Sequence, residues 1–165
     1  MNLRQALDAV EELSNAHPGL FEDVEIQAVF GDERPCIGDW SDPSNRGMLV
    51  TGDGIGDKSG VYCFVSPAGD VLYIGKATKN NLHHRVWHHV KTPYFGEDGH
   101  ATFPNHSFRG GNEVAAYESD ILNGRARLGV ITISDQSLVS LAEVYLHVVH
   151  KKMHNRLPVF NKQIG

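Results

Sequence analysis

Four side chains of this sequence have the types and the order along the chain that phosphate chemistry requires: Tyr62, Tyr73, Arg85 and Glu143. A tyrosine hydroxyl can orient or deprotonate a water molecule, and a guanidinium presents a planar set of donors to a phosphate. A carboxylate oxygen is a ligand that Mg²⁺ prefers in proteins. Whether these groups can act together depends on the elements that carry them.

Residues 60–91 contain both tyrosines, and their pattern predicts a β-hairpin. Two runs rich in Val, Tyr, Phe and Ile, which favour strands, flank a turn in which Pro67 and Gly69 are favourable. Alternation along the first run places Tyr62 and Phe64 on one face. Tyrosines in a hairpin are usually packing residues, so their chemical value depends on the residues that come after them in the chain.

The segment after the hairpin is expected to be a helix that carries cations. Its buried stripe repeats every four residues: Leu82, Val86 and Val90. Arg85 and His89 are also four apart, and they are expected to lie beside this stripe and to face the same way. Such a helix brings Arg85 and the preceding Lys76 close to the tyrosines. The histidines at 83–84 and 88–89 are a further candidate for metal binding.

A long helix is expected from about residue 137 to 155, with Ser134 or Asp135 as its N-cap. Its apolar face is expected to comprise Leu138, Leu141, Tyr145, Val148 and Val149. Glu143 is the only carboxylate in residues 136–165, so it is the candidate metal ligand of this helix.

Three histidines follow Glu143 at helical spacing: His147, His150 and His154. Three interpretations of this stripe are open. Glu143 could hold Mg²⁺, which commonly uses one or two carboxylates and keeps several waters. The glutamate and the histidines could instead bind Zn²⁺ or another ion that favours imidazole. The stripe could also be an ordinary polar face.

Taken in order, these features resemble the GIY-YIG nuclease family from Gly60 to about Asn161, roughly two-thirds of the chain. The first triplet reads Gly60-Val61-Tyr62, with valine in place of isoleucine, and the second reads Tyr73-Ile74-Gly75. The other matching positions are a helical arginine, a late helical glutamate and an asparagine in a P-x-x-N element: Arg85, Glu143 and Asn161. Two further positions are similar to those of restriction-type members: Lys76 and His89.

The resemblance implies a mixed α/β (α+β) domain in which a small three-stranded antiparallel sheet is flanked by helices. It also implies an endonuclease that hydrolyses phosphodiester bonds of nucleic acid, with DNA as the expected substrate. We expect a one-metal mechanism in which Glu143 holds Mg²⁺ or Mn²⁺. Tyr62 is the expected general base; because a free tyrosine has a pKa of about 10, this role requires nearby cations, for which Lys76 and Arg85 are the candidates.

The remaining matched residues have expected roles around this reaction. Arg85 neutralises charge that develops on the phosphate, and Tyr73 orients the nucleophile or the phosphate. His89 assists in proton transfer, and Asn161 holds the site together. The two glycines of the triplets, Gly60 and Gly75, are expected to be supporting residues.

Charge is distributed unevenly along the 165 residues. The net charge is −5 overall, but it is −9 for residues 1–57 and +4 for residues 58–165, which also hold nine of the ten histidines. We therefore expect an acidic N-terminal extension packed on a GIY-YIG-like domain whose partner is an anion such as nucleic acid. The extension should contain a helix over residues 2–16, a strand over Val24–Phe30 and a loop.

Composition limits the other possibilities. No apolar run approaches the roughly 18 residues of a membrane span, and two cysteines are too few for a disulfide framework; a cytoplasmic protein without a membrane partner is expected. Cleavage of both strands by a single active site would favour a homodimer. Two other functions stay open: a non-catalytic nucleic-acid-binding or protein-interaction domain on the same fold, and a histidine-rich metal-binding protein.

Overall fold

A computed structural model of the chain describes residues 1–29, 56–90, 94–95, 97, 101–102, 117, 120 and 125–165. The helices with described bounds are α1 (Leu3–Ala16), α2 (Leu82–Val90) and α4 (Gln136–His154). The strands are β1 (Ile26–Val29), β2 (Gly60–Val65), β3 (Val71–Ala77), β4 (Tyr94–Phe95), β5 (Ala101–Thr102) and β6 (Arg127–Ile133). The sequence also predicts a helix over residues 113–123 and loops over 31–59 and 92–112. Most of these three segments lies outside the described residues, and residues 117 and 120 are described as helical.

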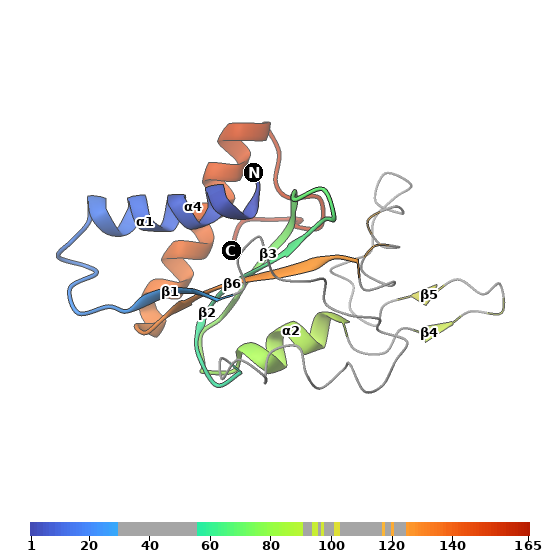
Figure 1. Cartoon of the computed structure of the whole chain (residues 1–165), viewed down its shortest axis with the longest axis horizontal. Coiled ribbons are helices and arrows are strands. Elements are labelled where there is room, and N and C mark those ends of the chain that lie inside the picture. Colours follow the sequence, from blue (N-terminus) through green and yellow to red (C-terminus); the bar gives the residue numbers. More distant parts are fainter. Residues whose placement is uncertain are drawn as a thin grey trace.

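Four antiparallel strands form the main sheet in the order β1–β6–β2–β3 (Figure 1). The expected mixed α/β class is confirmed, but the expected number of three strands is wrong. The fourth strand is β1, which comes from the N-terminal extension and pairs with β6, Ile26 opposite Ile133. β6 is buried along almost all of its length, and pairing with β1 and β2 satisfies its backbone hydrogen-bonding groups on both sides.

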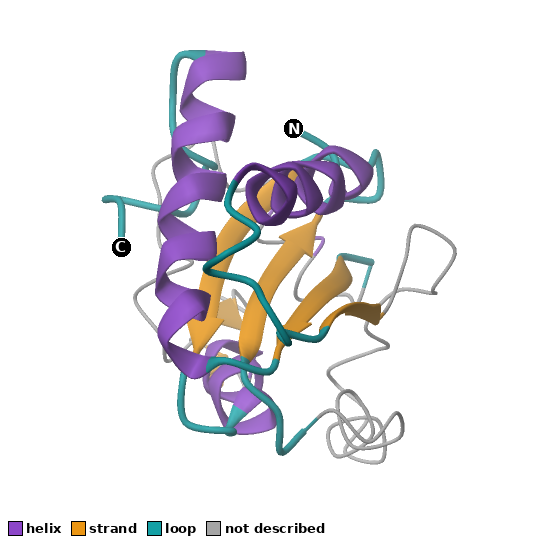
Figure 2. Cartoon of the chain, turned by 90° about the vertical axis from the view of Figure 1, so that its left-hand side faces the viewer, coloured by secondary structure: helices purple, strands orange, loops and turns teal. Residues whose placement is uncertain are grey.

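Helices cover both faces of this sheet, with α1 and α4 on one face and α2 on the other (Figures 1 and 2). The larger core lies between the sheet and the helices α1 and α4. It combines side chains of α1 such as Val10, of β2 such as Val61 and Cys63, and of α4 such as Leu146. Packing against α2 involves the opposite face of β2, which carries Tyr62 and Phe64.

The start of α1 is fixed by reciprocal capping. The Asn2 side chain accepts a hydrogen bond from the Gln5 backbone N–H, and the Gln5 side chain accepts one from the Asn2 backbone N–H, each at 2.9 Å. Leu3, Val10 and Leu13 form its buried apolar stripe, and Leu7 is only partly covered. This packing brings Leu3 against Gly129 of β6, where a Cβ would lie 2.3 Å from a Leu3 methyl carbon.

The long helix α4 begins as expected, because Asp135 is its N-cap and accepts from the Ser137 backbone N–H at 2.8 Å. Its expected apolar face is partly wrong. Leu141 and Val148 are exposed, and the buried residues of α4 include three polar ones, Glu143, His147 and His150. The polar stripe of α4 is therefore buried alongside apolar residues such as Leu138 and Leu146. Among the described residues, no helix combines the length and the apolar character that crossing a membrane requires.

Candidate active site

β3 is an edge strand, and its side chains reach both faces of the sheet. Tyr73 and Gly75 share the α2 side with Tyr62 of β2, whereas Ile74 and Lys76 point toward α4. A cavity of about 560 Å³ lies at this edge. Its lining includes polar and aromatic side chains from both faces of the sheet and from the C-terminal segment: Tyr73, Lys76, Arg85, Glu143, His147 and Asn161. The edge strand is thus where the expected site residues of the α2 side, Tyr73 and Arg85, meet those of the α4 side, Lys76 and Glu143.

The tyrosines and His89 form a buried aromatic cluster on the α2 side. The Tyr62 hydroxyl oxygen lies 2.7 Å from Nε2 of His89 in a hydrogen bond. The centroid of the Tyr73 ring is 4.8 Å from that of His89 and 6.1 Å from that of Tyr62. Tyr73 is half-buried and lines the cavity, whereas Tyr62 and His89 are buried behind it.

Burial determines the protonation states of Tyr62 and His89. Removal from water raises the pKa of Tyr62 well above 10, with the neighbouring Tyr73 acting in the same direction and Arg85 acting to lower it. Burial also lowers the pKa of His89 from 6.5 to about 3, and the charge of Arg85 adds to this effect. Both groups are therefore neutral at pH 7. The raised pKa of Tyr62 is opposite in direction to the one that a tyrosine base requires.

Gly75 allows the tyrosine rings to approach each other. A Cβ at this position would lie 2.6 Å from both Cζ and the hydroxyl oxygen of Tyr62, and 2.7 Å from Cε1 of Tyr73. Gly60 is enclosed by backbone, since a Cβ there would lie 2.3 Å from the carbonyl oxygen of Ile131. The glycines of the two triplets are thus places where neighbouring atoms leave no room for a side chain.

On the α4 side, Lys76 and Glu143 form an ion pair. Nζ of Lys76 lies 2.7 Å from Oε2 of Glu143, and the side chains are 30% and 7% exposed, respectively. The ammonium supplies the opposite charge that a buried carboxylate requires. The pair joins β3 to α4 at the cavity, so Lys76 lies on the other side of the sheet from the Tyr62 hydroxyl.

Arg85 reaches the same cavity from α2. Its Nε donates to the carbonyl oxygen of Lys76 at 3.3 Å, and its side chain is exposed. The expectation that Arg85 and His89 face the same way holds only partly, because His89 is buried in the aromatic cluster while Arg85 points to the sheet edge. A step of four residues turns a helix about 40° beyond a full turn, which is enough to separate the two environments.

Asn161 closes the edge of β3. Its Oδ1 accepts from the Ile74 backbone N–H and its Nδ2 donates to the Ile74 carbonyl oxygen, each at 2.9 Å. The next residue back, Phe160, donates its backbone N–H to the Leu72 carbonyl oxygen at 3.0 Å. An amide side chain here takes the place of a neighbouring strand. The expected supporting role of Asn161 therefore has a definite geometry: it fixes the strand that carries Tyr73 and Lys76.

The histidines after Glu143 have different surroundings. His147 is 1% exposed and lines the cavity. Nδ1 of His150 is hydrogen bonded to the Arg156 carbonyl oxygen at 2.9 Å, and Nε2 of His154 contacts the Met1 amino group. Neither of these two lines the cavity. Sequence reasoning included His147 only as a member of the stripe; its spacing of one helical turn from Glu143 is the signal that could have singled it out.

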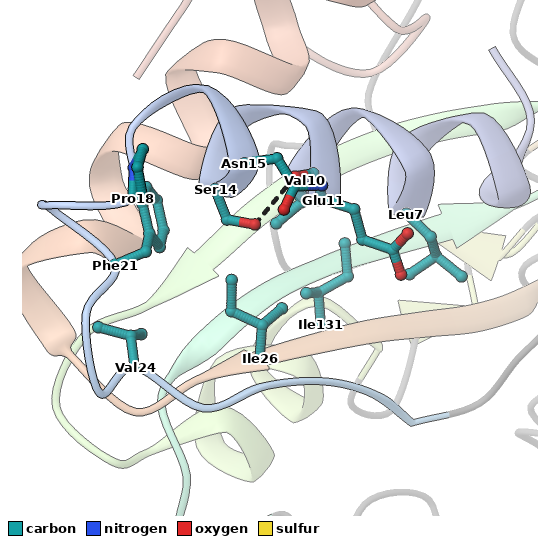
Figure 3. Close-up of a pocket in the computed structure, with 10 residues that line it drawn as sticks. All are labelled: Leu7, Val10, Glu11, Ser14, Asn15, Pro18, Phe21, Val24, Ile26 and Ile131. Carbon is teal, nitrogen blue, oxygen red and sulfur yellow. Dashed lines mark hydrogen bonds between the residues drawn. The ribbon is translucent and has the colours of Figure 1, made fainter.

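A second cavity, of about 460 Å³, lies between α1 and the strands β1 and β6 (Figure 3). Apolar side chains such as Val10, Phe21 and Ile131 line much of it, and Glu11 and Ser14 stand on its α1 side. It shares no lining residue with the cavity at β3. The residues suited to phosphate chemistry therefore gather at the edge of β3 and not here.

Comparison of the chain with protein-family models, with curated proteins and with solved structures finds no match in any of the three. The geometry of the cavity at β3 is accordingly the basis for a functional proposal.

Proposed function

We propose that this protein is a metal-dependent endonuclease of the GIY-YIG type that hydrolyses phosphodiester bonds, with DNA as the expected substrate. One observation carries the proposal: Arg85, the Lys76–Glu143 pair and Tyr73 line a single cavity, and the buried Tyr62–His89 pair lies directly behind Tyr73. Two cations, a carboxylate and a phenol around one opening, with a second phenol behind the first, are suited to holding and hydrolysing a phosphodiester.

The residues present fit a hard cation such as Mg²⁺ or Mn²⁺. Glu143 offers a carboxylate on the wall of a cavity of about 560 Å³, which has room for several waters at about 30 Å³ each. The Oδ1 and Nδ2 atoms of Asn161 are each bonded to Ile74, so Asn161 is assigned to fixing β3 and Glu143 to holding the ion. When bound at Glu143, such an ion would stabilise negative charge on the phosphate and on the departing oxygen.

Arg85 and Lys76 are the two cations that would act on the phosphate. Arg85 is exposed at the cavity, and its Nε is the donor in the bond to the Lys76 carbonyl oxygen. The terminal nitrogens of the guanidinium can bind phosphate oxygens as charge develops on them. Lys76 balances Glu143, and it would become available to the phosphate when another cation takes over that carboxylate.

Proton transfer is assigned to the aromatic cluster. Tyr62 is protonated at pH 7, so it can accept a proton from water only if its own proton leaves at the same time. Nε2 of His89, 2.7 Å from the hydroxyl oxygen, is the group in contact that can take it. Tyr73 lies between this pair and the cavity and can orient the water. Because Tyr62 does not line the cavity and its raised pKa opposes direct base catalysis, the role expected for Tyr62 becomes that of a relay together with His89.

The test is cleavage of supercoiled plasmid DNA titrated against Mg²⁺, Mn²⁺ and Zn²⁺. We expect metal-dependent nicking that Glu143→Gln abolishes, because the amide keeps the shape of the side chain and removes its charge. Arg85→Ala should lower the rate by about two orders of magnitude or more, while both variants keep the circular dichroism spectrum of the native chain.

The same titration separates the two alternatives. Binding of DNA without cleavage at any metal concentration would favour a non-catalytic nucleic-acid-binding domain. Tight metal binding with neither DNA binding nor cleavage would favour a histidine-rich metal-binding protein. Wild-type cleavage by Glu143→Gln would overturn the assignment of the metal to Glu143.

A further inference from the structure

His147 is a buried histidine whose role the proposed reaction leaves open. It is 1% exposed, and among the residues that the structure describes neither of its ring nitrogens has a hydrogen-bond partner. The Asn161 amide lies near the ring and raises its pKa as a hydrogen-bonding neighbour, but its Oδ1 and Nδ2 already bond to the backbone of Ile74 and neither is in hydrogen-bond geometry with the ring. A buried polar atom without a partner costs about 1–3 kcal/mol. A position needed only for packing would be filled more favourably by an apolar residue.

The imidazole of His147 is placed beside the proposed metal ligand. His147 follows Glu143 by four residues on α4, so their side chains are neighbours on the helix surface. Both line the cavity at β3. Two side chains four apart on a helix can bind one ion together, as paired histidines do in metalloprotease helices.

We propose that His147 is a second protein ligand of the ion held by Glu143, and that the site therefore prefers Mn²⁺ to Mg²⁺. This inference rests on the proposed function, because that function places the ion at Glu143. Mg²⁺ takes oxygen ligands almost exclusively, whereas imidazole nitrogen suits transition-metal ions. Mn²⁺ is the relevant ion of that group, since it shares with Mg²⁺ an octahedral, oxygen-rich shell that leaves places for water and phosphate.

The experiment measures metal binding by the full chain without nucleic acid. Mn²⁺ affinity is obtained from the electron paramagnetic resonance signal of free Mn²⁺, and Mg²⁺ affinity from competition. His147→Gln replaces the nitrogen by an amide oxygen of similar reach. We expect this variant to lose the preference for Mn²⁺ by about tenfold or more, since removal of even an outer partner of a metal ligand commonly costs about 10- to 100-fold in affinity.

A spectroscopic signature adds a readout that a structural role would not change. Bound Mn²⁺ in the wild-type chain should show electron spin-echo modulation from a directly bound ¹⁴N nucleus, and His147→Gln should lose it. His150→Gln is the matched control, because His150 is buried on the same helix but does not line the cavity; it should keep the modulation. If His147→Gln fails to fold, His147→Leu replaces it, since an apolar residue removes the unpaired nitrogens.

The outcomes separate this inference from the proposed function. Loss of the modulation and of the Mn²⁺ preference in the His147 variant supports the inference even if no variant cleaves DNA. Metal-dependent cleavage together with an unchanged Mn²⁺ preference and no ¹⁴N modulation overturns the inference and leaves the function standing. Absence of any Glu143-dependent Mn²⁺ binding in the wild-type chain overturns the inference as well.

Discussion

Nζ of Lys76 on β3 lies 2.7 Å from Oε2 of Glu143 on α4, so the buried carboxylate of the candidate site is already neutralised by a residue of the edge strand. Any metal ion that binds Glu143 must either displace this ammonium or share the carboxylate with it. The pair therefore links the stability of the metal-free protein to its affinity for a cation.

Lys76→Met should destabilise the metal-free protein by about 1–2 kcal/mol. Removing one partner of a fully buried pair costs about 3–5 kcal/mol, and the 30% exposure of the Lys76 side chain reduces this figure through screening by solvent. Urea unfolding in the presence of a chelator measures the loss. Added Mn²⁺ should then raise the melting temperature more in the variant than in the wild type, because the ion no longer competes with an ammonium.

Lys79→Met is the control for this prediction, because Lys79 is exposed and is not part of the cavity lining. It should change the free energy of unfolding by less than about 0.5 kcal/mol. Equal losses in both variants would show that the Lys76–Glu143 contact contributes nothing specific.

Tyr62→Phe should stop cleavage and also cost stability. The substitution keeps the ring and its packing but removes the hydroxyl, so Nε2 of His89 loses its partner at 2.7 Å in a buried position. We expect a loss of about 1–3 kcal/mol in the free energy of unfolding, together with loss of the proton relay. Chemical denaturation and plasmid cleavage measure the two effects separately.

Tyr73→Phe is the matched change for Tyr62→Phe. Tyr73 is half-buried at the cavity and is expected to orient the reactants, so its rate loss should be the smaller of the two. A larger loss at Tyr73 would mean that the roles of the two tyrosines are exchanged.

Gly75→Ala should displace the tyrosine rings. The added Cβ would lie 2.6 Å from the Tyr62 hydroxyl oxygen, a separation that forces atoms of the cluster to move. Overpacking of this kind costs about 1–3 kcal/mol. Gly19→Ala is the control, because a Cβ there meets no atom within 4 Å. Thermal unfolding of both variants provides the measurement; equal melting temperatures would show that the cluster repacks without cost.

The sequence predicted the local elements well, because each depends on nearby residues. The hairpin was predicted from Pro67 and Gly69. Gly69 has a φ of +96°, a backbone conformation that residues with a side chain rarely adopt. The sequence did not predict that β1 would pair with β6, since strand neighbours far apart in the chain leave no periodic pattern. Its prediction of the apolar face of α4 was partly wrong, because Leu141 and Val148 are exposed whereas the polar residues Glu143, His147 and His150 are buried.

The sequence likewise predicted only part of the candidate site. The spacing from Tyr73 to Arg85 and the position of Glu143 could be read in the sequence, and these residues do line one cavity. The sequence could not show that Lys76 and Tyr62 lie on opposite faces of the sheet, because the alternation of β3 and its register with β2 had first to be known. The orphaned nitrogens of His147 likewise depend on packing between helix, strand and C-terminal segment.

The buried His89 should make the protein less stable in acid. Its pKa is about 3 in the folded protein and 6.5 in an unfolded chain, so between these values the unfolded state binds more protons. The free energy of unfolding should therefore decrease as the pH falls below about 6.5, by at most about 1.4 kcal/mol per pH unit for this one proton. The pKa values of His147 and His150 are also lowered by burial, and they act in the same direction.

His89→Gln isolates the share of His89 in this pH dependence. The amide cannot take up a proton in this range, and it can still form a hydrogen bond with the Tyr62 hydroxyl. Urea unfolding of the wild type and the variant between pH 7 and 5 yields two slopes. We expect the slope of the variant to be smaller, because one proton fewer is taken up on unfolding. Parallel slopes would contradict the prediction and would mean that the imidazole of His89 is protonated in the folded protein as readily as in the unfolded chain.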